Sequence, residues 1–334
     1  MVIKHEFYMS LALKEAWKRQ GLTYPNPVVG ALILDKHGKI LSIAATQEAG
    51  KEHAELKAIE EALIMIGDTH IASLETASQK HAYILAHHDK RLEGASIYVT
   101  LEPCTHHGRT PPCSMLIKAC GFKTLICGTI DPNHEASGGI QALQSSGLTV
   151  ITDIMKEACE RLLTPFKSWQ ANRPFVFFKL ALSANGVYDG GTITSLESRT
   201  LVHALRHNID LLVIGGETVR ADRPTLDSRL VGGKAPDVLI LSRQKDFDQS
   251  IPLFSVSGRK VFIEENFDKI EQYRFIMIEG TQSLLQLCGA LVDWYCVFSS
   301  SSYKKGKTIQ MDKDFKRLHC LHNKQDTITW YKGL

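Results

Sequence analysis

The sequence predicts an α/β protein built from two domains. Its 334 residues, 44% of them hydrophobic, are too many for one hydrophobic core of ordinary size. Segments with the patterns of strands and helices alternate along both halves of the chain, which is typical of layered α/β folds. A helical segment ends in a proline-containing turn, so we place the boundary near Asn172, between domains 1–172 and 173–334.

The first half opens with apolar residues at helical spacing over residues 1–17, which predict an amphipathic helix rather than a signal peptide. Residues 23–34 combine a proline-bounded loop with a Val/Ile/Leu strand, and residues 38–47 predict its antiparallel partner in a hairpin. The remaining patterns predict helices at 51–67, 113–121, 138–147 and 156–174, and strands at 95–101, 123–131 and 148–151.

The second half repeats the alternation of strands and helices, so we expect α/β architecture there as well. The glycine-rich Gly-x-Gly-x-x-Gly fingerprint of standard dinucleotide-binding domains is missing from the sequence. The patterns predict strands at 175–183, 209–216, 237–242, 260–265, 275–280 and 293–300, with the clearest helices at 198–206 and 283–291.

The charge, hydrophobic runs and cysteines of the sequence argue against a nucleic-acid-binding or membrane-spanning protein. Residues 1–150 hold 14 Lys and Arg against 15 Asp and Glu, so this half has no excess of positive charge. A nucleic-acid-binding protein usually shows such an excess, and its absence favours a small-molecule substrate. No apolar run reaches the roughly 20 residues of a membrane span, and eight cysteines without an export signal indicate a reducing cytoplasm. We also expect a homo-oligomer.

The segment TLEPCTHHGRTPPC, residues 100–113, contains two cysteines that could bind a metal or could simply be buried thiols. A third ligand decides between these interpretations. His53 opens a predicted helix, and Glu55 follows two residues later. His-x-Glu together with Pro-Cys and a second Cys is the signature of zinc deaminases, so we predict that His53, Cys104 and Cys113 bind Zn²⁺.

This set of three ligands leaves the fourth tetrahedral position of zinc for a water molecule. Zinc lowers the pKa of such a water, and Glu55 is the candidate that moves protons between the water and the leaving amine. Taken separately, His53 and Glu55 would fit a solvated helix face. Another interpretation makes the zinc purely structural, with His106 or His107 as a fourth protein ligand.

Residues 103–113, with eight residues between the cysteines, resemble the deaminase domain of the bifunctional riboflavin biosynthesis family. Residues 24–34 and 131–140 resemble its flanking motifs. The resemblance implies a cytidine-deaminase-like three-layer fold and the same zinc ligands. It also implies a phosphorylated ribosylaminopyrimidine as substrate, contacted by Asn26 and by one or more of His106, His107 and Arg109. Relative to the family, residues 68–93 resemble an insertion, which we expect to be a polar surface excursion.

The second half is similar to the reductase of the same family, most clearly over residues 213–230. The resemblance implies a dihydrofolate-reductase-like fold that binds NADPH without the glycine-rich fingerprint. It places four residues at the substrate and eight at the cofactor. The expected substrate residues are Arg206, Leu226, Arg229 and Glu279, and the expected cofactor residues are Ala181, Thr194, Thr218, Asp222, Ser242, Thr281, Gln282 and Ser283.

Several positions in the second half depart from the family pattern. Residues 183–186 read SANG where SxDG is usual, and Thr192, Thr281 and Trp294 replace a tryptophan, a glycine and an acidic residue. The alternative interpretation is therefore a deaminase whose C-terminal domain is degenerate and serves nucleotide binding or oligomerisation.

Overall fold

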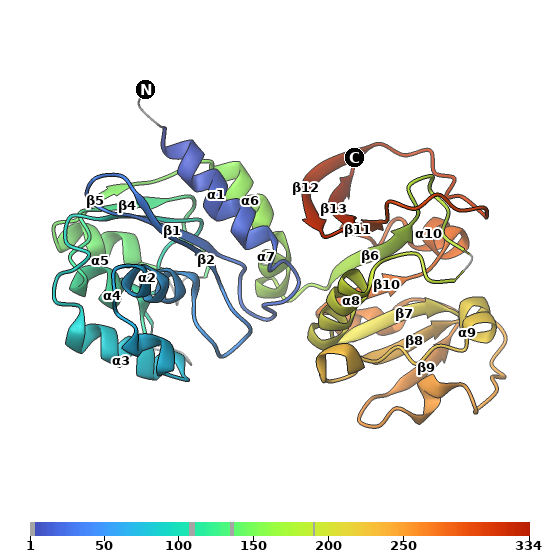
Figure 1. Cartoon of the computed structure of the whole chain (residues 1–334). Coiled ribbons are helices and arrows are strands. Elements are labelled where there is room, and N and C mark those ends of the chain that lie inside the picture. The colour runs from blue at the N-terminus through green and yellow to red at the C-terminus, as the bar shows by residue number, and fades with distance from the viewer. Residues whose placement is uncertain (1–3, 107–110, 134–136, 190) are drawn as a thin grey trace. The chain divides into compact units, whose positions relative to one another are not determined.

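The computed structural model describes residues 4–106, 111–133, 137–189 and 191–334. The chain divides into two compact units, Met1–Gln170 and Ala171–Leu334 (Figure 1). This division lies two residues from the boundary expected from the sequence. None of the helices formed by the described residues is both long enough and apolar enough to span a bilayer.

The first unit is built on a five-stranded sheet with the strand order β2-β1-β3-β4-β5. The predicted hairpin is confirmed: β1 pairs with β2 in antiparallel register, with Ala31 opposite Ala44. β1 is also antiparallel to β3, whereas β3, β4 and β5 are parallel. The strands are β1 Gly30–Leu34, β2 Ile40–Ala45, β3 Ser96–Val99, β4 Thr124–Cys127 and β5 Thr149–Ile151.

Helices cover both faces of this sheet, as a three-layer fold requires. Every residue of β1 is buried, because α1 packs on one face and α2 on the other (Figure 1). Gly30 permits the close approach of α1, since a Cβ there would lie 2.0 Å from Ala12 O. The helices are α1 His5–Trp17, α2 Ala54–Met65, α3 Ala77–His87, α4 Cys113–Ala119, α5 Gly139–Ser145, α6 Lys156–Leu162 and α7 Thr164–Gln170.

The expectation of a polar surface excursion at residues 68–93 is wrong. After a short 3-10 turn at His70–Ser73, this segment forms α3, which packs against α2 and α4. A capping box begins the helix, because Thr76 accepts from the backbone of Gln79 while the Gln79 side chain accepts from Thr76. Ala77, Ile84 and two polar side chains of α3 are buried, so the helix belongs to the domain core.

The second unit contains an eight-stranded sheet in the order β12-β13-β11-β6-β10-β7-β8-β9. The strands from β11 to β9 in that order are parallel, and an antiparallel hairpin extends the β11 edge. The elements are β6 Phe175–Leu182, α8 Leu196–Asn208, β7 Leu211–Gly215, α9 Gly216–Asp222, β8 Asp237–Leu241, β9 Val261–Glu264, β10 Phe275–Glu279, α10 Gln282–Cys288, β11 Trp294–Ser299, β12 Phe315–Asn323 and β13 Asp326–Gly333.

Sequence patterns identified six of these strands but missed three elements. Helix α9 has the sequence GETVRAD and buries only Gly216 and Val219, so it shows no apolar periodicity. The hairpin of β12 and β13 carries charged and polar residues on its exposed positions, which hides its strand pattern. On its buried side, Trp330 of β13 contacts Phe177 and Trp294 in the aromatic core of the sheet.

Candidate active site

The three predicted zinc ligands come together in the first unit. His53 is the N-cap residue of α2, Cys104 lies in the loop after β3, and Cys113 is the first residue of α4. Their donor atoms all lie within 4.8 Å of one another. His53 Nδ1 is 3.6 Å from Cys104 Sγ and 3.5 Å from Cys113 Sγ. Two helix starts and one loop therefore converge on a single point.

These donors fit a zinc ion in their spacing. Tetrahedral zinc with ordinary Zn–N and Zn–S bonds places a nitrogen and a sulfur ligand roughly 3.5 Å apart. The observed separations match that value. The thiols also form a coupled pair: hydrogen bonding between them lowers the pKa of Cys104 and raises that of Cys113. One sulfur is thus predisposed to be a thiolate, the form that binds metal.

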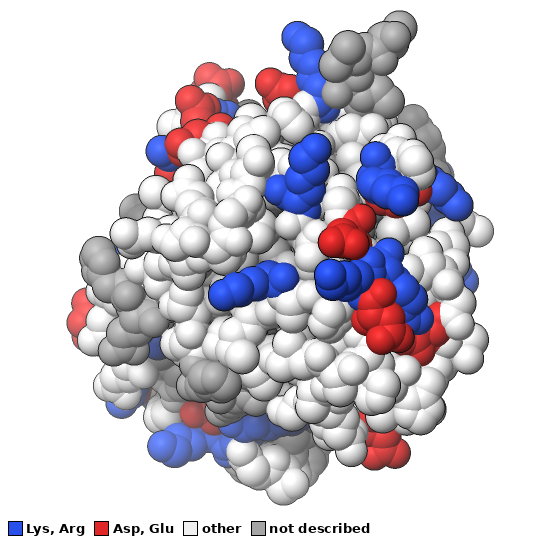
Figure 2. Space-filling view, turned by 90° about the vertical axis from the view of Figure 1, so that its left-hand side faces the viewer, with Lys and Arg blue, Asp and Glu red and all other residues white. Residues whose placement is uncertain are grey.

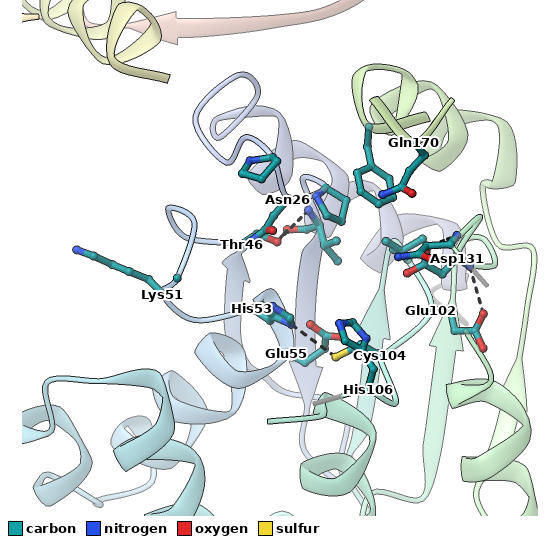
Figure 3. A pocket seen from close by; sticks show the side chains of 17 residues that line it. Asn26, Thr46, Lys51, His53, Glu55, Glu102, Cys104, His106, Asp131 and Gln170 are labelled. Atoms are coloured by element: carbon teal, nitrogen blue, oxygen red, sulfur yellow. Dashed lines mark hydrogen bonds between the residues drawn. The ribbon is translucent and has the colours of Figure 1, made fainter. Parts of the chain in front are cut away.

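Glu55 is the acidic residue beside this cluster. It lies in the first turn of α2, only 4% exposed, and Figure 3 shows it between His53 and Cys104. Burial, followed by the negative charge of Cys104, raises the pKa of Glu55 to about 7. A bound cation would counteract this shift. Position and burial together suit Glu55 to exchange protons with a molecule in the site.

A pocket of about 390 Å³ opens over the cluster (Figure 3). Asn26, predicted to contact substrate, is on its wall, and its backbone is fixed by hydrogen bonds with Thr23. His106 also lines the pocket. His107 and Arg109, predicted to contact substrate, lie outside the described residues. Within the described part of the chain, the metal-binding group consists of His53, Cys104 and Cys113 and does not include His106.

Sequence reasoning missed several residues at this pocket. Phe166 and Gln170 of α7 line it, although the sequence indicated only a connecting helix there. Glu102 is buried and accepts hydrogen bonds from the backbone N–H groups of Asp131, Gly138 and Ile140. The sequence did offer one indication that Glu102 is important: it lies two residues before Cys104 in the segment 100–113.

In the second unit, Arg206 on α8 makes a bidentate ion pair with Glu279 at the end of β10. Arg206 Nε and Nη2 each lie 2.9 Å from a Glu279 carboxylate oxygen, and Lys179 Nζ lies 3.8 Å from Oε2. Burial by itself would raise the pKa of Glu279, but Arg206 and then Lys179 outweigh it and lower the value to about 2. Glu279 is therefore ionised at neutral pH.

Most of the residues expected at substrate and cofactor lie at or after the C-terminal ends of parallel strands in this sheet. Parallel strands end at the same edge, where ligands of open α/β sheets usually bind. Leu226 is buried in the loop after α9, whereas Arg229 is 60% exposed and pairs with Asp227. Near strand ends lie Ala181 on β6, Thr194 before α8, Thr218 and Asp222 on α9 after β7, Ser242 after β8, and Thr281, Gln282 and Ser283 after β10.

Comparisons with known proteins agree with this division. Residues 2–129 match the cytidine and deoxycytidylate deaminase zinc-binding region, and residues 174–301 match the RibD C-terminal domain. Riboflavin biosynthesis protein RibD of Corynebacterium ammoniagenes is 36% identical over 307 residues, which cover 86% of this chain and 83% of that protein. The chain belongs to the RibD family. The match to RibD of Aquifex aeolicus, also 36% identical, covers 70% of this chain and 60% of that protein.

Solved structures extend the similarity to nearly the whole chain. A diaminohydroxyphosphoribosylaminopyrimidine deaminase/5-amino-6-(5-phosphoribosylamino)uracil reductase from Thermotoga maritima is 26% identical, with a TM-score of 0.64 and coverage of 98% of each chain. RibD of Acinetobacter baumannii shares the fold, with 24% identity and a TM-score of 0.62. Both domains of a bifunctional RibD deaminase and reductase are therefore present, and the predicted fold classes are confirmed.

The departures from the family pattern have local explanations. Trp294 is 1% exposed and packs edge-on against Phe175 and Trp330, so it belongs to the core of the sheet. Thr281 is the N-cap of α10 with φ −117°, a conformation that does not require glycine. Asn185 accepts from Ser183 Oγ at 2.7 Å and donates to Lys304 O at 2.8 Å. It therefore joins the SANG turn to the loop after β11.

Proposed function

We propose that this chain catalyses two successive reactions of riboflavin biosynthesis on one phosphorylated substrate. The first is zinc-dependent hydrolytic deamination of the diaminopyrimidinone ribosyl 5'-phosphate in the first unit. The second is NADPH-dependent reduction of the ribosyl group to ribityl in the second unit. The observation that carries the proposal is the convergence of His53, Cys104 and Cys113 beside the buried Glu55.

In the deamination, the chain supplies ligands, proton transfer and orientation. Zinc bound by these three residues would lower the pKa of a coordinated water and make it a nucleophile near neutral pH. Glu55 accepts a proton from the water as the C–O bond forms and delivers it to the ring nitrogen. It then moves the proton of the new hydroxyl group to the amine, so that the C–N bond breaks, the carbonyl forms and ammonia leaves. Asn26 is placed on the pocket wall to hydrogen-bond the pyrimidine. The substrate residues His107 and Arg109 remain part of the proposal.

In the reduction, charged groups at the strand ends orient the substrate. NADPH would supply the hydride when bound. Arg206 and Arg229 suit the phosphate, since guanidinium groups match phosphate oxygens. Glu279 keeps Arg206 and Lys179 ordered at the end of β10. The N-terminal residues of α10, Thr281 to Ser283, and the positions on α9 are proposed to contact the cofactor.

Charge favours a small substrate over nucleic acid. On the face shown in Figure 2, the described Lys and Arg side chains are separated by uncharged residues or lie next to Asp and Glu. A continuous basic stripe of the kind that binds a phosphate backbone does not cover this face of the described residues. A cytoplasmic location and a homo-oligomeric state stay predictions.

The decisive experiment is a paired assay on zinc-analysed protein given the diaminopyrimidinone ribosyl phosphate. Ammonia release and NADPH oxidation are followed separately. We expect both signals, with one zinc per chain. Removing zinc with a chelator should stop ammonia release while NADPH oxidation continues on substrate that has already been deaminated. Ammonia without NADPH oxidation would instead support a degenerate C-terminal domain, and silence in both assays would overturn the proposal.

A further inference from the structure

Helix α3 contacts both chain segments that carry zinc ligands at helix starts. Two consecutive residues make these contacts, Lys80 and His81, and both are buried. Lys80 reaches the residue that precedes His53, and His81 reaches the residue that precedes Cys113. The helix lies in the segment that resembles an insertion, and it has no part in the chemistry proposed above.

The contact of Lys80 is a compact ion-pair network. Lys80 Nζ lies 2.5 Å from Glu52 Oε1 and 3.0 Å from Glu60 Oε1, and its side chain is 10% exposed. Lys57 Nζ lies 3.1 Å from Glu60 Oε2 and 3.6 Å from Glu61 Oε1, so Glu60 joins the two lysines. The network therefore holds the chain next to His53 in place.

His81 contacts the start of α4 through a hydrogen bond to the backbone. His81 is 3% exposed, and its Nε2 lies 3.2 Å from Pro112 O. A carbonyl oxygen can only accept, so Nε2 must carry the proton. Pro112 is the N-cap residue of α4, and Cys113 follows it directly. The bond thus fixes the start of the helix that presents the Cys113 thiol.

We propose that Lys80 and His81 are positioning residues that hold His53 and Cys113 at the spacing zinc requires. The inference rests on the proposed zinc site. The two ligands come from separate segments, and their donor atoms are 3.5 Å apart only if both helix starts keep their places. Removal of residues that orient metal ligands without binding the metal typically lowers metal affinity 10- to 100-fold.

The same helix provides a matched control at its far end. Tyr83 donates to Asp68 at 3.1 Å and 3.3 Å, and Arg91 pairs with Asp68 at 2.6 Å. These bonds anchor α3 away from the zinc ligands. Tyr83→Phe therefore removes one anchor of the helix without touching either ligand segment, and it separates loosening of α3 in general from loss of ligand positioning.

The test measures zinc release from the full-length zinc protein into a chromogenic chelator. We expect His81→Leu to release zinc about 10-fold faster than wild type, by the lower end of the range for groups behind metal ligands. His81→Gln, whose amide can still donate to Pro112 O, should restore a rate near that of wild type. Tyr83→Phe should change the rate less than about twofold. A His81→Leu rate equal to wild type, or a Tyr83→Phe rate as fast as that of His81→Leu, would overturn the proposal.

Lys80 is tested with Lys80→Met against Lys80→Arg, which keeps the positive charge. Faster release from Lys80→Met, rescued by arginine, is the expected result, and equal release from both proteins contradicts a role for Lys80. If Lys80→Met does not fold, the His81 variants decide. Cobalt-substituted proteins add a spectroscopic readout: His81→Leu should shift the thiolate-to-cobalt absorption bands, and Tyr83→Phe should not. Wild type that binds no zinc would refute the proposed function itself.

Discussion

The two units each bury a glutamate among the residues predicted for chemistry, yet they give it different neighbours. Glu55 lies beside two cysteines, and burial followed by the charge of Cys104 raises its pKa to about 7, a shift that a bound cation would counteract. Burial acts on Glu279 too, but Arg206 and Lys179 outweigh it and lower that pKa to about 2. Neighbours, and not burial alone, decide what a buried carboxyl group can do.

The difference separates two uses of the same side chain. A carboxyl group whose protonated and ionised forms are both accessible can carry protons, as the proposed deamination requires of Glu55. A carboxylate clamped by two cations stays ionised and instead fixes the cations, so Glu279 orders Arg206 for a phosphate. The first unit is therefore suited to proton transfer, and the second to binding and orientation.

The largest effect is expected from a substitution that removes proton transfer by Glu55. Glu55→Gln keeps the size of the side chain but cannot accept a proton, so ammonia release should fall by about 10²–10⁴-fold. Zinc content should stay at the wild-type level, because Glu55 is not a predicted ligand. Ammonia release and zinc analysis of the purified protein check both points.

The control is Glu15→Gln on α1, where Glu15 pairs with the exposed Lys18 at the protein surface. It should leave ammonia release within about twofold, because exposed ion pairs contribute little. Loss of zinc in Glu55→Gln would contradict the separation of ligand and proton carrier.

A second prediction concerns the clamped glutamate. Glu279→Gln leaves Arg206 and Lys179 without their anion and should lower the free energy of unfolding at neutral pH by about 3–5 kcal/mol. The pKa of Glu279 is depressed from 4.5, so its stabilisation is fully present above pH 4.5 and is lost as the pH falls towards 2. Denaturant unfolding of both proteins between pH 7 and pH 3 should show the difference shrinking with acid.

Glu264→Gln at the end of β9 is the control for this measurement. Glu264 is a half-buried glutamate at a strand end and pairs with Lys245 at 3.8 Å. Loss of this ion pair should lower the free energy of unfolding by no more than about 1 kcal/mol. If both variants lost the same free energy of unfolding, the ion pairs of Glu279 would have no special role in stability.

The smallest effect is expected from a substitution of Arg206, the residue that Glu279 holds in place. Arg206→Ala should raise the reductase KM for the ribosyl phosphate by about 10- to 100-fold, the worth of one charged hydrogen-bonding group. Ammonia release by the first unit should not change. Steady-state NADPH oxidation measures the KM, with the exposed Arg199→Ala on the same helix as control. An unchanged KM in Arg206→Ala would exclude this residue from the phosphate site.

Much of the molecule could be predicted from the sequence because its signals are local. Buried parallel strands are short apolar runs, and those of both sheets were found. The candidate zinc ligands could be selected because two cysteines and a His-x-Glu pair fit few other chemistries. The C-terminal hairpin was missed because its charged positions interrupt the pattern.

The sequence by itself determined which side chains can bind zinc and which carboxyl group accompanies them, because ligand chemistry depends on residue type and spacing. Only the tertiary structure decided which distant groups hold that site. Lys80 meets Glu52 from 28 residues away, and His81 meets Pro112 from 31. Likewise, only folding placed Arg206 against Glu279, 73 residues apart. Local sequence patterns cannot predict such pairs, because the pairs form only when separate elements pack together.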